Sequence, residues 1–161
     1  MTLEKFDNSE YIQVSELLNV SSKTFFDEIV RSILGDIQRQ TNRKMHASQL
    51  KSGLTYKKKI SGRSSKNAEV IIKILECVPS KIYSASFTSE IDITTVTYEI
   101  EEKEENKICV TYTETFKLLS GKKLRSQSKL HKMYLHKKSE KKSRKLLKHI
   151  EEYILMNQNK E

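Results

Sequence analysis

The chain has 161 residues, close to the size of a single domain, and its hydrophobic residues (36%) fall in periodic clusters, which excludes a wholly disordered chain. No stretch approaches the ~20 consecutive apolar residues of a membrane span, and the two cysteines, Cys77 and Cys109, lack the spacing of a zinc site or a disulfide framework. The net charge of +9 is concentrated in residues 121–149, which hold twelve Lys or Arg against one acid and carry +11, leaving −2 for the rest.

The N-terminal part of the chain predicts one strand and two helices. Residues 1–13 are polar and acidic and lack the basic start and apolar core of a secretion signal, so we expect a cytoplasmic protein with reduced thiols. Apolar side chains at alternate positions predict a strand over 10–20. An apolar stripe with helical spacing then predicts a helix over 22–40. Two serines can cap this helix, Ser21 and Ser22. A short helix is expected around 47–51.

The middle of the chain changes to a period of two residues, which predicts an antiparallel meander with one buried and one wet face. The alternating segments are 54–60, 69–76, 82–88, 91–100 and 108–118. A loop, SGRSSKNA, is predicted between the first two segments, and Pro79 marks a turn. The apolar residues of 91–100 change parity midway, which predicts a β-bulge near Thr94 and Thr95.

The end of the chain returns to a helical period. A stripe at i, i+3, i+4, i+7 and i+8 predicts a long final helix that packs through Leu146, Leu147, Ile150, Tyr153 and Ile154. The helix can begin further upstream, because Leu130, Met133 and Tyr134 can extend the same stripe. Together the elements predict one α+β domain over 1–161, with an ordered core of about 10–156.

This order of elements, with the longest helix last, resembles the helix-grip (START/Bet v 1-like) fold of the START/polyketide-cyclase superfamily. The resemblance rests on the strand-to-helix junction VSSKTFFDEIV and on the strands in CVPSKIYSASFTSEIDITTVTYEIEE and KICVTYTETF. It implies a curved antiparallel sheet of about six strands, in the order β-α-α-β-β-β-β-β-α. The long C-terminal helix is then expected across the concave face, with a cavity between helix and sheet.

More narrowly, the chain is similar to a bacterial family known as domain of unknown function 3284, through FFDEIVRSILGDI, LTYKKKI and the basic helix that leads to RKLLKHIEEYI. The similarity covers roughly residues 10–155 and consists mainly of hydrophobic patterns. The superfamily includes lipid carriers, hormone receptors, cyclases and chaperone activators, so the resemblance implies a fold and does not choose an activity. One departure is that this chain has Tyr, Thr and Ser at many sheet positions, where binders of large hydrophobic ligands need an apolar wall.

The predicted concave face carries aromatic side chains and one carboxylate: Tyr56, Phe87, Tyr98, Tyr112, Glu114 and Phe116, with Tyr83 nearby. These residues can line a small-molecule cavity, or the rings can form a plain core. Glu114 is the one catalytic candidate, because a carboxylate buried there could act as a general acid or anchor a ligand. Alternatively, Glu114 meets water at the strand end or pairs with Lys58 across the sheet.

The basic segment is the other candidate site, and three interpretations of it stay open. Its side chains can bind the phosphates of a nucleic acid, bind an anionic membrane surface, or form the solvated face of a helix that packs on the sheet. The segment has few aromatic residues for base stacking, and its exposed face has no Trp or Phe for membrane insertion. The residues expected on this surface are Lys137, Lys138, Lys141, Lys142, Arg144, Lys145 and Lys148.

Several classes of site have no motif in this sequence. The four histidines lack metal-ligand spacing, and Gly-rich phosphate loops and nucleophile motifs are missing, so we expect neither a metal site nor a cofactor. We therefore expect a non-enzymatic domain that binds a small apolar or aromatic ligand, or a protein partner. The alternatives are a nucleic-acid or anionic-surface binding module acting through 122–148, and a cyclase- or hydratase-like enzyme that uses Glu114 and neighbouring tyrosines.

Overall fold

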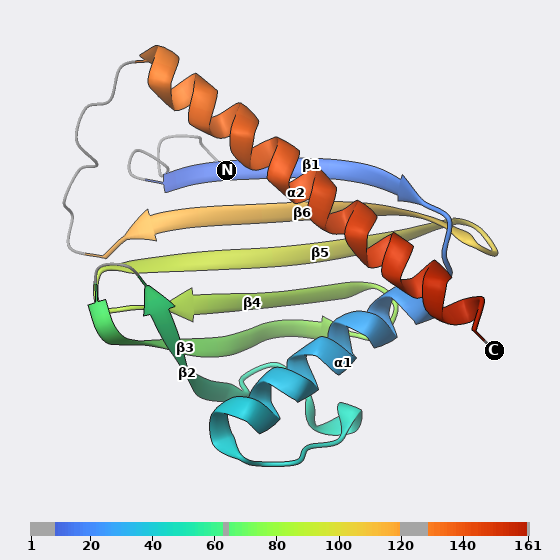
Figure 1. Ribbon diagram of the computed structural model, residues 1–161, viewed down its shortest axis with the longest axis horizontal. Coiled ribbons are helices and arrows are strands. Elements are labelled where there is room, and N and C mark those ends of the chain that lie inside the picture. Colours follow the sequence, from blue (N-terminus) through green and yellow to red (C-terminus); the bar gives the residue numbers. More distant parts are fainter. Residues whose placement is uncertain (1–8, 63–64, 120–128, 161) are drawn as a thin grey trace.

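A computed structural model describes residues 9–62, 65–119 and 129–160 of the protein. Six antiparallel strands form one curved sheet, and both long helices lie on the same face of it (Figure 1). The elements in chain order are β1 (Ser9–Leu18), α1 (Ser22–Thr41), the 3-10 turn η2 (Ala47–Gln49), β2 (Thr55–Gly62), β3 (Ser65–Val78), β4 (Ile82–Thr88), β5 (Asp92–Glu104), β6 (Lys107–Leu118) and α2 (Lys129–Gln158). This arrangement confirms the predicted α+β helix-grip fold.

The strands are arranged in the order β1-β6-β5-β4-β3-β2. Strands β2 to β6 follow one another as hairpins, whereas β1 pairs with the last strand, from Ser9 opposite Lys117 to Leu18 opposite Ile108. Strands β1 and β2 are therefore the two edges of the sheet. In the described part of the chain, neither helix combines the length and the apolarity needed to cross a bilayer.

Helix α1 is fixed at both ends by polar contacts. One of the two predicted caps forms, because Ser21 Oγ accepts a hydrogen bond from the Thr24 N–H at 3.1 Å. The helix ends at Asn42, whose left-handed backbone (φ 58°) lets its N–H bond to the Gln38 carbonyl. Between these ends, the predicted stripe is buried against the sheet through Phe25, Phe26, Ile29, Val30 and Ile37.

Helix α2 crosses the concave face, but its buried stripe differs from the predicted one. The prediction was right for Leu147 and Ile154, which are 0% and 3% exposed, and wrong for Leu146 and Tyr153, which are 39% and 43% exposed. Two polar residues, Ser143 and Glu151, are buried in the stripe and have hydrogen-bond partners. Polar side chains can be buried only where they have hydrogen-bond partners, and an apolar pattern does not show such partners. The apolar spacing therefore assigned Leu146 and Tyr153 to the buried stripe in place of Ser143 and Glu151.

Two predictions about the strands are also wrong. Strand β5 pairs with β6 without interruption from Asp92 to Glu102, so the bulge expected near Thr94 and Thr95 does not form. The apolar residues change parity because Ile91 lies in the turn before β5, where it is 63% exposed, and Ile93 faces the convex side of the sheet. The loop predicted over 61–68 is mostly strand, since β2 extends to residue 62 and β3 begins at residue 65; residues 63–64 lie outside the described residues.

Candidate functional site

A row of three tyrosines crosses the concave face of the sheet. In the strand register, Tyr83 of β4 lies opposite Tyr98 of β5, and Tyr98 lies opposite Tyr112 of β6. The rings of Tyr98 and Tyr112 pack edge to face, with 5.1 Å between their centroids, and Phe25 of α1 packs against Tyr98 at 6.2 Å. This tyrosine row therefore forms one rigid wall of aromatic rings under the helices.

A second aromatic row runs parallel to the first, four residues along each strand, and joins Tyr56, Ile72, Phe87, Thr94 and Phe116. Between the two rows lies a third row, in which Ile74, Ala85, Val96 and Glu114 pair in turn. Val96 is smaller than the rings on either side of it and lines a hollow in the sheet surface, whereas the neighbouring Ala85 is fully buried. We call this hollow the trough.

The trough and the two helices line a half-open cavity of about 420 Å³. Its wall includes four of the six predicted residues, Tyr56, Phe87, Tyr98 and Tyr112, whereas Glu114 and Phe116 lie on the same face outside the wall. The helices cover the cavity through residues that the sequence did not single out. These are chiefly Ile29, Ile33 and Asp36 of α1 and Leu146 and Ile150 of α2.

The tyrosine hydroxyls of the wall differ in their partners. Tyr56 donates to Asp36 Oδ2 at 2.8 Å, and Tyr112 donates to Glu114 Oε2 at 3.0 Å. Among the described residues, the Tyr83 and Tyr98 hydroxyls have no hydrogen-bond partner, yet no fully buried side-chain polar atom is unsatisfied. Since both residues line the cavity, their hydroxyls are open to it and can bond a ligand.

Burial raises the pKa of all four tyrosines. It raises the pKa of Tyr98 to about 12, and the negative charge of Glu114 adds to the shift. Burial is also the main reason that the pKa values of Tyr56, Tyr83 and Tyr112 lie well above that of an ordinary tyrosine. At neutral pH these four side chains are therefore uncharged hydrogen-bond donors.

Asp36 is the centre of a cluster of charged groups at the β2 end of the cavity. Its Oδ1 lies 3.0 Å from Lys58 Nζ and 3.8 Å from Arg39 Nη2, and its Oδ2 accepts from Tyr56. Lys58 thus pairs with Asp36 and not with Glu114, the partner considered from the sequence. Asp36 could have been found from the sequence, because it is an acid seven residues after Ile29, on the apolar stripe of α1.

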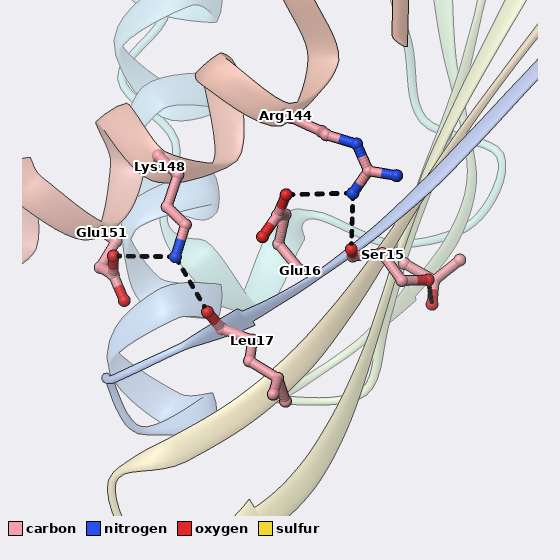
Figure 2. A network of polar contacts seen from close by, with 7 residues as sticks. Ser15, Glu16, Leu17, Arg144, Lys148 and Glu151 are labelled. Carbon is pink, nitrogen blue, oxygen red and sulfur yellow. Dashed lines mark hydrogen bonds and ion pairs between the residues drawn. The ribbon is translucent and has the colours of Figure 1, made fainter. Parts of the chain in front are cut away.

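The predicted basic surface is divided by contacts with β1 (Figure 2). Arg144 Nη1 donates to the Ser15 carbonyl and to Glu16 Oε1, both at 3.0 Å. Lys148 Nζ donates to the Leu17 carbonyl at 3.2 Å and lies 3.7 Å from Glu151 Oε1. These two side chains therefore occupy carbonyls on the free edge of β1 and attach α2 to the sheet.

The other five predicted residues lie on the outer face of α2: Lys137, Lys138, Lys141, Lys142 and Lys145. All five are exposed, and none pairs with an acid within the described ranges. We call them the outer lysine face. The upstream basic residues of the predicted segment, Lys122, Lys123 and Arg125, lie outside the described residues. In the same described part of the chain, no three His, Cys, Asp or Glu side chains come together as metal ligands.

Comparisons with known proteins agree with the fold described above. A family model described as "Domain of unknown function (DUF3284)" matches residues 12–136, and no curated protein matches the sequence. Among solved structures, Ara h 8.0201 has a TM-score of 0.61 at 15% identity and covers 92% of this chain and 99% of its own. SA2116 of Staphylococcus aureus, a protein of unknown function, has a TM-score of 0.58 at 12% identity, covering 96% and 98%. TTHA0849 of Thermus thermophilus has a TM-score of 0.58 at 13% identity, covering 92% and 99%. At these identities the likeness shows the fold alone.

Proposed function

We propose that this chain, which belongs to the DUF3284 family, is a non-enzymatic protein that binds one small aromatic or apolar molecule in its concave cavity. The description of that family assigns no activity. The observation that carries the proposal is the cavity of about 420 Å³ between two aromatic rows. Its volume falls within the range of typical ligand sites, ~300–1,000 Å³. The free hydroxyls of Tyr83 and Tyr98 supply the few polar groups that orient a ligand in such a site.

The shape of the trough favours a flat ring system. A ring placed over Val96 would have aromatic side chains on both sides, where offset and edge-to-face contacts are favourable. Ile33 of α1 and Ile150 of α2 would cover its other face. A molecule of one or two fused rings, with a hydrogen-bond acceptor within reach of Tyr83 or Tyr98, is therefore the class of ligand that fits best.

The chemistry of the wall supports binding over catalysis. Its tyrosines have raised pKa values and stay protonated at neutral pH, so none of them supplies a base. Glu114, the carboxylate that a cyclase or hydratase would use, is engaged by Tyr112 and lies outside the cavity wall. The carboxylates that do belong to the wall are also engaged, Asp36 by Lys58 and Tyr56, and Glu28 by Arg31.

The proposal is tested by filling the trough. Val96→Phe places a ring in the trough, and Thr95→Phe places the same ring on the convex face one residue away. We expect purified protein to carry a small ligand in native mass spectrometry, or to bind 2-naphthol in calorimetry, and Val96→Phe to lose at least tenfold in affinity. Circular dichroism confirms that both variants fold. Equal binding by both variants, or no small ligand on the unsubstituted protein by either method, would refute the proposal.

A second candidate function rests on the outer lysine face. Five lysines on one face of a helix, with no acidic partner in the described part of the chain, can neutralise phosphates along a nucleic-acid backbone without reading its sequence. A bilayer is the weaker partner, because the apolar stripe of α2 packs on the sheet through Leu147 and Ile154 and cannot insert.

Charge reversal tests this second function. Binding of a mixed-sequence duplex, followed by fluorescence anisotropy, should weaken steeply with salt and disappear when four lysines of the outer face, Lys137, Lys138, Lys141 and Lys142, become Glu. The matched control reverses four exposed lysines away from α2: Lys57, Lys59 and Lys73 in the sheet and Lys81 in the turn before β4. Equal losses in the two variants contradict a dedicated surface. Binding to anionic phosphatidylglycerol vesicles without binding to the duplex would also contradict it.

A further inference from the structure

The charged groups at the β2 end of the cavity are unbalanced. Asp36, Arg39 and Lys58 all contribute to the cavity wall, so two cations surround one carboxylate. Glu28 also belongs to the wall, but its charge is balanced by Arg31, which pairs with it at 2.7 Å from outside the wall. This end of the cavity therefore has an excess of one positive charge.

These groups also have more unused hydrogen-bond donors than unused acceptors. Both oxygens of Asp36 are engaged, one by Lys58 at 3.0 Å and the other by Tyr56 at 2.8 Å. Arg39 lies 3.8 Å from Asp36, too far for a hydrogen bond, and its side chain is 70% exposed. Lys58 has further N–H groups and is 33% exposed. Donors that can meet an anion are thus free, whereas an incoming amine would have to displace Lys58 from Asp36.

We infer that the cavity prefers an aromatic ligand that carries a carboxylate, with the ring in the trough and the carboxylate held by Arg39 and Lys58. This inference rests on the proposed function of the cavity and names its ligand class. A carboxylate suits the site because the planar guanidinium group can bond both of its oxygens. One molecule can reach both parts, because Arg39, Lys58 and Val96 line the same cavity.

The experiment compares two probes of the same shape, naphthalene-2-carboxylate and the neutral naphthalene-2-carboxamide, by calorimetry at low salt. The unsubstituted protein should bind the acid about tenfold more tightly than the amide. Arg39→Gln and Lys58→Gln should each weaken binding of the acid by more than binding of the amide and so remove most of this preference, and Lys58→Arg should retain it. Arg43→Gln is the matched control, because Arg43 is exposed near the end of α1 and is not part of the cavity wall.

The outcomes separate this inference from the proposed function. If the amide binds as tightly as the acid, or if Arg39→Gln weakens both probes equally, the carboxylate preference is wrong and the cavity function stands. If neither probe binds and no other aromatic molecule does, the cavity function itself fails. A preference that is present in the unsubstituted protein and in Arg43→Gln, and lost in Arg39→Gln, supports the inference.

Discussion

The carboxylate of Glu151 attaches α2 to the turn between β1 and α1, and we expect its removal to destabilise the protein by about 2 kcal/mol. Glu151 is 8% exposed, and its Oε2 accepts a hydrogen bond from the Asn19 backbone N–H at 2.6 Å. Hydrogen bonds to charged groups contribute about 1.5–3 kcal/mol. The lower part of this range applies because Asn19 is exposed, so water can replace part of the bond. Lys148 adds little, since its side chain is 45% exposed and 3.7 Å away.

Urea unfolding followed by circular dichroism measures this effect. Glu151→Ala should lower the free energy of unfolding by about 2 kcal/mol, which corresponds to a fall in Tm of about 4–8 °C, and Glu151→Gln should lose about half as much because an acceptor remains. The control is Glu152→Ala, whose side chain is 68% exposed and 3.9 Å from His149, with an expected change within about 0.5 kcal/mol. Similar losses at positions 151 and 152, or no loss at 151, would refute the reasoning.

Three further predictions concern the core, the tyrosines and the sheet edge. Leu147→Ala should cost about 2–5 kcal/mol in urea unfolding, because Leu147 is 0% exposed, and Leu155→Ala, at a 37% exposed position, under about 1 kcal/mol. In an alkaline absorbance titration, the cavity tyrosines should ionise later than tyrosines of the unfolded chain. Because the pKa values of these tyrosines are raised in the folded protein, their contribution to stability is complete below about pH 10 and is lost as the pH rises further. Ionisation of all seven tyrosines together near pH 10 would contradict this prediction. The pair Arg144→Ala with Lys148→Ala frees two carbonyls of β1 and should increase light scattering at equal concentration, compared with Lys141→Ala and Lys145→Ala. Equal scattering by the two pairs would show that these contacts do not protect the edge.

The fold could be predicted because most of its elements bury apolar side chains with a simple period. The alternation in β6 places Ile108, Val110 and Tyr112 in the core, as expected. The exceptions are positions where a distant polar partner decides. Glu151 is buried because it bonds Asn19, 132 residues earlier in the chain, and no local pattern contains that information.

The candidate site was predicted in part for the same reason. Strand parity was sufficient to place four aromatic residues on the cavity wall, but Glu114 and Phe116 share that parity and lie outside the wall. The difference depends on where the helices cover the sheet, which parity does not encode. The trough was not predictable, because Ala85 and Val96 become neighbours only through the register of β4 and β5.

The pairing of β1 with β6 has a consequence for the order in which the chain folds during synthesis. The hairpins from β2 to β6 join neighbouring segments, but Gln13 bonds Thr113 across 100 residues, and Arg144 bonds Ser15 across 129. Closing such long loops is slow, since much chain entropy is lost before the contacts form. During synthesis, β1 stays unpaired until β6 has left the ribosome, and the outer carbonyls of β1 stay unbonded until α2 has been made. We therefore expect the meander to form first in a nascent chain, and the first strand and last helix to join it together.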